Sequence, residues 1–490
     1  MKKGFDNELY VKLQTETIKK RIEMFDKLYL EFGGKLFDDY HALRVLPGFE
    51  LNAKIRLLEE LKDQAEVIFC INAADIERKK IRADHGISYD IEVIRLVKSL
   101  TKLGISINSV VITLYKEQPS VARFQEKLKN LGIKTYIHRP TKGYPTDIDT
   151  IVSEEGYGAN PYIETTKPLV VVNAPGPCSG KLATCLSQLY HEYKRGVKAG
   201  YAKFETFPVW SLPLKHPVNM AYEAATADLK DVNMIDNFHL DAYGISAVNY
   251  NRDLEIFPVL KNILTKITGE EIYKSPTDMG VNSISKCIYD DEVVKEAATL
   301  EIVRRYYQAL TDSKINGSDI DAANRIKLLM NELNIDEDYI KERQVALKKQ
   351  AKEQKRVIAL TLPNGKTITG KETKLLSPAS ALLLNAVKEL SNIDDKVLLL
   401  SPNVLEPIIK LKNDSLKDNN VLTANEVLIA LSICSVTNPV AEEALNKLGD
   451  LSNLNAHATY IVEGEDLRIF KKLKINLPCE PCFYDDHIVK

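Results

Sequence analysis

The sequence predicts an α/β protein with an open, parallel-sheet N-terminal domain, a central α/β domain that continues into a helical connector, and a smaller C-terminal α/β domain. Three observations support this prediction. The 490 residues exceed one ordinary core and, at roughly 150 residues per domain, suggest about three. Short β-rich runs alternate with helical patterns through residues 1–160. A hairpin pattern followed by helices begins again near residue 356.

The predicted N-terminal domain, residues 1–160, contains several candidate strands. They are "KLYLEF" (27–32), "EVIFCIN" (66–72), "SVVITLY" (109–115) and "KTYIH" (134–138). Two stretches between them, 90–104 and 120–132, place apolar residues at helical spacing and close with glycine. Strands and helices in this alternation are typical of a parallel sheet covered by helices.

The predicted central domain, residues 161–355, opens with the strand "PLVVV" (168–172), and a helix at 181–196 follows a short turn. A second helix is predicted at 253–269, and the pattern is almost wholly helical from 291 to 356. The last part of that stretch, 340–356, carries seven basic and two acidic residues. Contact with RNA or an acidic partner is one interpretation, and a solvated connecting helix is the favoured one.

The predicted C-terminal domain covers residues 356–490. The letters "PNG" between two β-rich runs indicate a hairpin at 356–370, and Ser377 is a candidate cap for the helix that follows. The apolar run "KVLLLS", two helical stretches and a β-rich segment at 458–462 complete the domain. It contains no recognisable catalytic motif, so we expect a scaffold or subunit-contact role, with a homo-oligomer as one possible form.

The composition and the amino-terminal sequence indicate which partners and which cellular location to expect. A formal net charge of −2 gives no reason to expect nucleic acid or an anionic membrane as a partner. The lysines at the amino terminus precede no apolar segment, and no stretch approaches the roughly 18 apolar residues of a membrane helix. We therefore expect a cytoplasmic protein. Seven cysteines without repeating spacing predict reduced thiols. Cys479 and Cys482 are interpreted as structural thiols, because zinc needs about four ligands.

The stretch "APGPCSGK" (174–181) directly follows the strand at 168–172 and precedes a long helix. A helix that starts just after a strand presents unpaired main-chain N–H groups and the positive end of its dipole. Glycines let the main chain curl around an anion, and a lysine adds a mobile charge. The candidate phosphate-binding residues are Gly176, Pro177, Cys178, Ser179, Gly180, Lys181 and Thr184. A strand-to-helix turn without a ligand is the alternative.

The same loop departs from the usual pattern G-x-x-x-x-G-K-[ST]. Pro175 stands where the first glycine belongs, and Leu182 and Ala183 follow the lysine where a hydroxyl would hold magnesium. The nearest hydroxyl, on Thr184, lies three positions after Lys181. The phosphate cradle is therefore present in the sequence, while the metal ligand is displaced.

Several long stretches resemble an uncharacterised family of bacterial proteins of about this size that is known only as a domain of unknown function. They are "LYLEFGGKLFDDYHALRVLPGFE", "EGYGANPYIETTKPLVVVNAPGPCSGKLATCLSQLYHE", "GVKAGYAKFETFPVWSLPLKHPVN", "YKSPTDMGVN" and "SALLLNAVKEL". The resemblance covers essentially the whole chain. It implies that the central domain has a P-loop-like nucleoside-triphosphate-binding fold, and it implies no particular reaction.

A second glycine and lysine motif follows the strand at 27–32. Gly33, Gly34, Lys35 and Arg44 form a candidate second anion site, and a glycine turn with solvated charges is the alternative. Magnesium would need carboxylates. The candidates are Asp147, Asp149, Glu205, Asp228, Asp231 and Asp236. Glu205 is the nearest to the end of an apolar strand, and His216, held between prolines, is a candidate acid or base.

The sequence therefore supports one leading hypothesis and two rivals. The leading hypothesis is a nucleotide-binding enzyme of the P-loop type that uses ATP or GTP with Mg²⁺ to transfer or cleave a phosphoryl group. The reaction is coupled to a small-molecule substrate, a phosphorylated or carboxylated metabolite, and Lys181, His216 and Glu205 are the candidate catalytic residues. The first rival is a non-catalytic regulatory or assembly protein that binds a nucleotide or phosphometabolite. The second is an enzyme that acts on a phosphorylated small molecule without a triphosphate.

Overall fold

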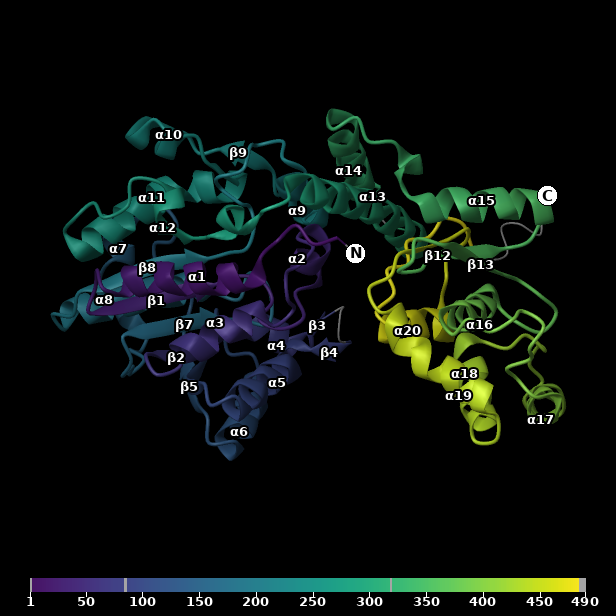
Figure 1. Cartoon of the computed structure of the whole chain (residues 1–490). Coiled ribbons are helices and arrows are strands. Elements are labelled where there is room, and N and C mark those ends of the chain that lie inside the picture. The colour runs from purple at the N-terminus through teal and green to yellow at the C-terminus, as the bar shows by residue number, and fades with distance from the viewer. Residues whose placement is uncertain (1, 83–85, 318–319, 484–490) are drawn as a thin grey trace. The chain divides into compact units, whose positions relative to one another are not determined.

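The computed structural model describes residues 2–82, 86–317 and 320–483 (Figure 1). The chain forms two compact units, one of residues 2–298 and one from residue 299 onward. The α/β class predicted from the sequence is confirmed in both.

The first unit is built on a seven-stranded sheet in which all neighbouring strands run parallel. In spatial order the strands are β11 (Gly280–Val281), β8 (Ala199–Phe204), β1 (Lys27–Phe32), β7 (Leu169–Asn173), β2 (Ala65–Asn72), β5 (Ser106–Thr113) and β6 (Lys134–Ile137). The central strands are runs rich in Val, Ile, Leu and Phe, and nearly every residue in them is buried. Such runs are what a parallel sheet covered on both faces requires.

Strands from the two sides of residue 160 alternate in this one sheet. β7 lies between β1 and β2, with Leu28 opposite Leu169 on one side and Val67 opposite Val171 on the other. The border that the sequence suggested at residue 160 therefore falls within a single sheet. Local sequence patterns predict the strands but carry no information on which strands pair.

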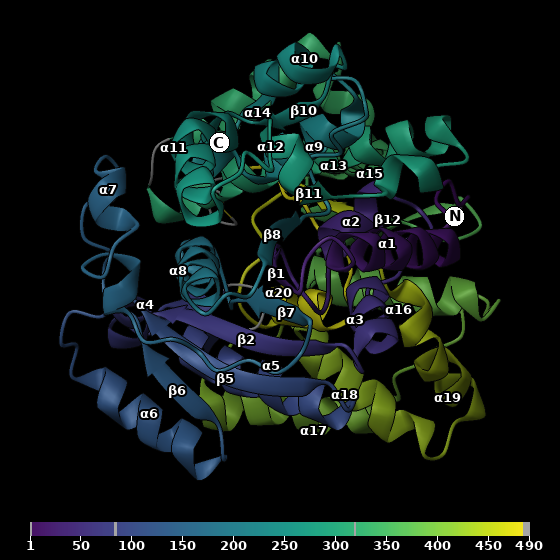
Figure 2. The ribbon, with the colours of Figure 1, turned by 90° about the vertical axis from the view of Figure 1, so that its left-hand side faces the viewer.

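Helices cover both faces of the sheet. Figure 2 shows α8 (Lys181–Lys194) and α11 (Asn251–Thr268) on one side of β8, β1 and β7, with α1 (Asn7–Ile22) and α3 (Ala53–Leu61) on the other. The helices predicted at 90–104 and 120–132 are confirmed as α5 (Tyr89–Lys102) and α6 (Ser120–Asn130). The shorter elements are α2 (Tyr40–Val45), α4 (Ala73–Glu77), β3 (Ile81–Arg82), β4 (Ile87–Ser88), α7 (Ile148–Ile151), α9 (Pro217–Ala225), β9 (Asn233–Ile235), α10 (Asn237–Tyr243), β10 (Val248–Tyr250) and α12 (Pro276–Met279).

The connections after β1 and β7 run in opposite directions. From β1 the chain passes over β7 to reach β2, and from β7 it passes through α8 and over β1 to reach β8. Right-handed crossovers in opposite directions fall on opposite faces of the sheet. A crevice therefore opens where the carboxyl ends of β1 and β7 meet, the usual ligand position in an open parallel sheet. Here the Asn173 Nδ2 donates to the Phe32 carbonyl over 3.0 Å.

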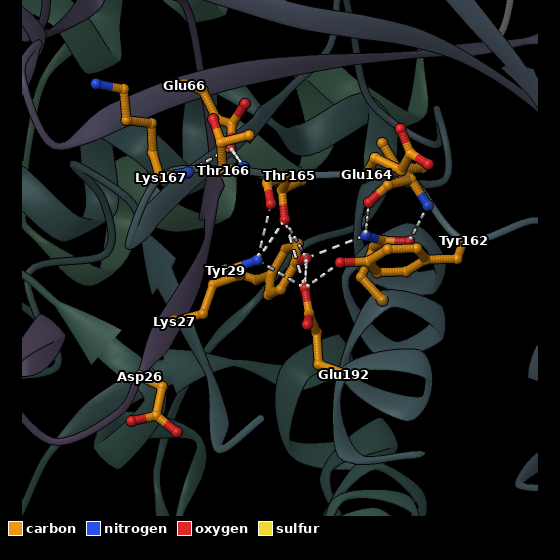
Figure 3. Close-up of polar contacts among 12 residues, drawn as sticks. Asp26, Lys27, Tyr29, Glu66, Tyr162, Glu164, Thr165, Thr166, Lys167 and Glu192 are labelled. Atoms are coloured by element: carbon orange, nitrogen blue, oxygen red, sulfur yellow. Dashed lines mark hydrogen bonds and ion pairs between the residues drawn. The ribbon is translucent and has the colours of Figure 1, made fainter. Parts of the chain in front are cut away.

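A buried polar cluster joins α8 to β1 and to the segment that leads into β7 (Figure 3). At its centre lies Glu192, which is 1% exposed. Its Oε1 accepts from the Lys27 Nζ at 3.0 Å, the Tyr29 hydroxyl at 2.8 Å and the Tyr162 hydroxyl at 3.1 Å. Glu192 therefore fixes the last turn of α8 over the centre of the sheet.

The second unit contains a three-stranded antiparallel sheet in the order β13–β12–β14. Its strands are β12 (Val357–Thr361), β13 (Thr367–Lys371) and β14 (Ala456–Ala458), and its helices are α14 (Asp321–Glu332), α15 (Lys341–Glu353), α16 (Pro378–Leu390), α17 (Pro402–Lys410), α18 (Ala424–Ser435), α19 (Pro439–Asn446) and α20 (Gly464–Lys472). α13 (Asp291–Asn316) begins in the first unit and ends in the second.

The hairpin and the helix cap predicted for this unit are confirmed. β12 and β13 pair across the "PNG" turn, and the Ser377 side chain accepts from the Ser380 N–H at 3.2 Å. The apolar run 396–401 forms neither a helix nor a strand, and of 458–462 only the first residue is in β14. Tyr460 and Ile461 are nevertheless buried. Their apolar side chains therefore pack in the core, although these residues are not part of a β-strand.

The cysteines occur in both units, and each is a reduced thiol. The Cys479 and Cys482 thiols donate to the carbonyls of Leu477 and Thr459. None of the cysteines is in a disulfide among the described residues. No helix in the described ranges has the length and apolar character to cross a bilayer.

Candidate functional site

A cleft of about 540 Å³ lies at the carboxyl ends of β1, β7 and β8. Gly33, Gly34 and Lys35 line it from the turn after β1, and Gly176, Pro177 and Lys181 line it from the turn after β7. The two candidate anion sites predicted from the sequence are therefore neighbours in one cleft. β8 contributes Lys203, the residue directly after that strand is Glu205, and the start of α11 contributes Arg252 and Asp253.

The turn after β7 is held in shape from within the protein. Cys178 and Gly180 have left-handed main-chain φ angles of 56° and 81°. The Thr113 hydroxyl donates to the Ser179 carbonyl at 2.8 Å, and the Ser179 hydroxyl donates to the Gly176 carbonyl at 2.9 Å. The side chain of Ser179 thus supports the turn and is buried, while Cys178 is exposed.

The first turn of α8 keeps its main-chain donors available. The first helical bond runs from the Thr184 N–H to the Gly180 carbonyl at 3.0 Å. Gly180 offers no side chain as a cap, and the N–H groups of residues 181–183 donate to no other residue that the structure describes. Residues 181–183 are not buried. Unpaired amides at the positive end of a helix dipole favour an anion.

Lys181, the first residue of α8, extends toward the end of β1. Its Nζ lies 3.6 Å from the Glu31 Oε1, and the other Glu31 oxygen accepts from the Tyr201 hydroxyl at 2.8 Å. The side chain of Thr184 turns the other way: it is 1% exposed, and its hydroxyl accepts from the Cys70 thiol. Thr184 therefore belongs to the core under the helix and does not line the cleft.

The turn after β1 packs directly on Glu205. A methyl group on Gly33 would lie 2.8 Å from the Glu205 Cγ, and one on Gly34 would lie 3.0 Å from the Lys54 Nζ. Lys54 is itself 2% exposed and forms an ion pair with Asp39 at 2.9 Å. A side chain at position 33 would clash with Glu205, so the glycine at this position reflects packing against Glu205 in the cleft.

Glu205 belongs to a charged cluster that also contains Lys203 and Asp253. The Lys203 Nζ lies 3.1 Å from the Glu205 Oε1 and 2.7 Å from the Asp253 Oδ2. Burial raises the pKa of Glu205 from 4.5 to about 7; the Lys203 ammonium opposes this shift and the Asp253 carboxylate adds to it. Burial would lower the pKa of Lys203, but the nearby carboxylates raise it overall. The cluster therefore pairs a fixed positive charge with a carboxyl group that titrates near neutral pH.

Two stacked tyrosines form another wall of the cleft. The rings of Tyr222 and Tyr250 lie 5.7 Å apart. The Tyr250 hydroxyl is buried and has no hydrogen-bond partner among the described residues. A buried hydroxyl without a partner is rare in native proteins, and other atoms of Tyr250 line the cleft.

The structure brings some of the predicted site residues together and separates others. Gly33, Gly34, Lys35, Gly176, Pro177, Lys181 and Glu205 share the cleft. His216 lies elsewhere: its Nδ1 caps α9 by accepting from the Val218 N–H, and its Nε2 lies 3.0 Å from Asp291. Burial lowers the pKa of His216. Arg44 is on α2 and is not among the lining residues.

The candidate magnesium carboxylates are dispersed. Asp147 caps α7, and Asp149 pairs with Lys266. Asp236 is buried and caps α10, whereas Asp231 pairs with Arg252 at the edge of the cleft. Asp228 lies in a short turn after α9. No group of three or more His, Cys, Asp and Glu side chains suited to a metal ion occurs in the ranges that the structure describes.

Sequence reasoning missed half of the cleft. The residues it did not single out include Lys203, Tyr222, Tyr250, Arg252 and Asp253. Lys203 stands two positions before Glu205, which directly follows the same strand. This spacing was the one available signal, since alternate residues along an extended chain share a face. The others come from loops and helices whose position depends on strand order.

Replacing Gly180 with alanine should lower the free energy of unfolding by more than the roughly 1–2 kcal/mol of a left-handed residue. An added methyl would lie 2.8 Å from the Thr113 Cβ. Gly196→Ala is the matched control, because Gly196 has a similar φ of 78° and nothing within 4 Å of the methyl position. Urea unfolding measures both. Equal losses would show that the contact with Thr113 does not shape the turn.

Comparison with known proteins shows the family. The family description "Domain of unknown function DUF1846, N-terminal" matches residues 3–334, and "Domain of unknown function DUF1846, C-terminal" matches residues 339–488. A UPF0371 protein of Clostridium tetani is 57% identical over 491 residues, covering 98% of each chain. One of Clostridium botulinum (strain Langeland) is 55% identical over 498 residues, covering 100% of this chain and 99% of its own. The resemblance to an uncharacterised family is thus confirmed, and the chain belongs to the DUF1846 family of UPF0371 proteins.

Proposed function

We propose that the protein is an enzyme that binds a phosphorylated small molecule in the cleft and removes a proton from it with Glu205. One observation carries this proposal. An uncapped helix start and a carboxyl group with a pKa near 7 line the same crevice at the carboxyl ends of β1 and β7.

The anion side of the cleft is the turn after β7 with the start of α8. Main-chain amides of residues 181–183 are available, and Lys181 adds a charge beside them. Lys35 lines the opposite wall. A phosphate group offers several acceptor oxygens to such donors.

The proton-transfer side is the cluster of Lys203, Glu205 and Asp253. A general base works best when its pKa is near the working pH, and Glu205 meets this condition. Lys203 stabilises the carboxylate after the proton has left. Glu205 keeps 31% of its side chain exposed, which gives a ligand access to the oxygens.

The described residues do not fit the magnesium part of the ATP or GTP hypothesis. They hold no group of three or more His, Cys, Asp and Glu side chains suited to a metal ion, and the Thr184 hydroxyl is buried against Cys70. We therefore derive no step through a magnesium-bound triphosphate. Lys181 at the first position of α8 still favours the phosphates of a nucleotide as one form of the anion, so ATP and GTP are second candidate ligands.

Replacing Lys181 with alanine should weaken phosphorylated ligands about 10- to 150-fold, because a hydrogen bond to a charged group contributes about 1.5–3 kcal/mol. Isothermal titration calorimetry measures the affinity of glucose 6-phosphate, AMP, ATP and GTP, each with and without Mg²⁺. Lys194→Ala is the control, since Lys194 lies at the other end of α8 and pairs with Glu154. Unchanged affinity in Lys181→Ala would overturn the anion site.

The same titrations separate the candidates. Binding of the sugar phosphate or AMP without a requirement for Mg²⁺ supports the leading proposal. Tight binding of ATP or GTP that depends on Mg²⁺ supports the nucleotide enzyme. Incubation of the bound ligand with the protein then decides between an enzyme and a regulatory protein, because the regulatory protein returns the ligand unchanged.

A further inference from the structure

A second cavity of about 200 Å³ lies beside the cleft in the first unit. The two share Lys203, Glu205 and Asp253 in their linings. The charged cluster therefore forms a wall with a space on either side. The turn after β7 lines the cleft, and Leu182, in the first turn of α8, lines the second cavity.

The inner cavity is lined mainly by apolar side chains. Leu182 comes from α8, Ile256 and Leu260 from α11, and Met279 from α12. Trp210 completes this wall with a broad aromatic surface. Apolar and aromatic walls gain free energy when an apolar group displaces water from them.

The polar side chains in the lining already form hydrogen bonds within the protein. The Asn282 amide donates to the Glu205 and Thr206 carbonyls at 3.1 and 3.0 Å. The Asn249 amide donates to the Thr277 hydroxyl at 2.8 Å, and that hydroxyl donates to Asp236 at 2.6 Å. A sugar ring would need these donors for its own hydroxyls. The cavity is thus matched to a ring with few polar groups.

We propose that the inner cavity binds an aromatic ring, and that the substrate is a phosphorylated compound that carries such a ring. This inference rests on the proposed function for the phosphate. The volume agrees with it, since an engineered apolar cavity of about 150 Å³ binds benzene. With the ring inside and the phosphate at α8, the part of the molecule that joins them lies beside Glu205.

Trp210 is the only tryptophan of the chain, so its fluorescence reports directly on the inner cavity. The probe is 4-nitrobenzyl alcohol, whose nitroaromatic ring quenches indole fluorescence on contact and which carries no phosphate. We expect saturable quenching in the full-length protein. Quenching that rises linearly with probe concentration, as it does for free N-acetyltryptophanamide, would overturn the inner site.

Ile256→Phe fills the cavity and should weaken the probe at least tenfold. Val259→Phe is the matched control, because Val259 lies on the same helix, is partly buried and is not in the lining. Leu182→Phe is a second filling variant from a different helix and keeps the test valid if the first fails to fold by circular dichroism. Equal affinity in both filling variants and the control would refute the assignment.

A last measurement keeps this inference separate from the phosphate proposal. Lys181→Ala should leave the affinity of 4-nitrobenzyl alcohol unchanged and weaken 4-nitrobenzyl phosphate. Saturable binding of the alcohol with no gain from the phosphate supports the ring site and overturns the phosphate site. Binding of the phosphate without quenching of Trp210 does the reverse.

Discussion

Replacing Glu192 with alanine should lower the free energy of unfolding of the first unit by about 3–5 kcal/mol, the range measured when one partner of a buried ion pair is removed. The substitution leaves the Lys27 ammonium, with 12% of its side chain exposed, without its carboxylate, and the Tyr29 and Tyr162 hydroxyls lose an acceptor. Urea unfolding followed by the fluorescence of Trp210 measures this effect, because the only tryptophan lies in the first unit.

The double variant Lys27→Met with Glu192→Leu tests the cause. Replacing both charges with apolar groups removes the unpaired ammonium, so the double variant should lose less stability than the sum of its two single variants. Strict additivity would show that Lys27 and Glu192 contribute independently. The cluster in Figure 3 would then not act as a unit.

Replacing Glu205 with glutamine should lower kcat by about 10²- to 10⁴-fold, the usual contribution of a general base. In the unaltered protein, kcat/KM for the ligand found by titration should rise with pH and level off above about 7, the pKa of Glu205, because the base acts when deprotonated. Glu255→Gln is the control, since Glu255 is exposed on α11. A kcat/KM that falls with pH over this range would contradict the assignment as a base.

The Glu205 carboxyl group also makes the free energy of unfolding depend on pH. Its pKa in the native state is about 7, against 4.5 for an ordinary glutamate. Between these values the native state binds more protons than the unfolded state, so the free energy of unfolding falls as pH rises. In Glu205→Gln this part of the pH dependence should be absent.

The sequence predicted elements well where their signal is local. "PLVVV" predicts a buried strand, "PNG" predicts a hairpin, and Ser377 predicts a helix start; the structure has each of them. Each of these signals affects only the few residues next to it. This holds for a run of β-branched residues, for a turn that requires glycine and for a capping hydroxyl. Their outcome therefore depends little on the rest of the chain.

The candidate site was only partly predictable, because it depends on strand order. Gly33 and Lys181 had local signals and do share the cleft. Asp253 has none, since its role arises from the ion pair with Lys203 on a distant strand. Thr184 shows the opposite failure: its position after Lys181 suggested a ligand, but the turn of the helix directs its hydroxyl to Cys70 in the core.

The place of β7 between β1 and β2 also bears on how the chain matures during synthesis. The first two large strands emerge from the ribosome roughly a hundred residues before the strand that separates them. Until then each exposes an unpaired hydrogen-bonding edge, and long-range pairing of this kind is slow to form. The nascent chain therefore exposes strand edges to which chaperones can bind. The crevice cannot form until β7 has been synthesised.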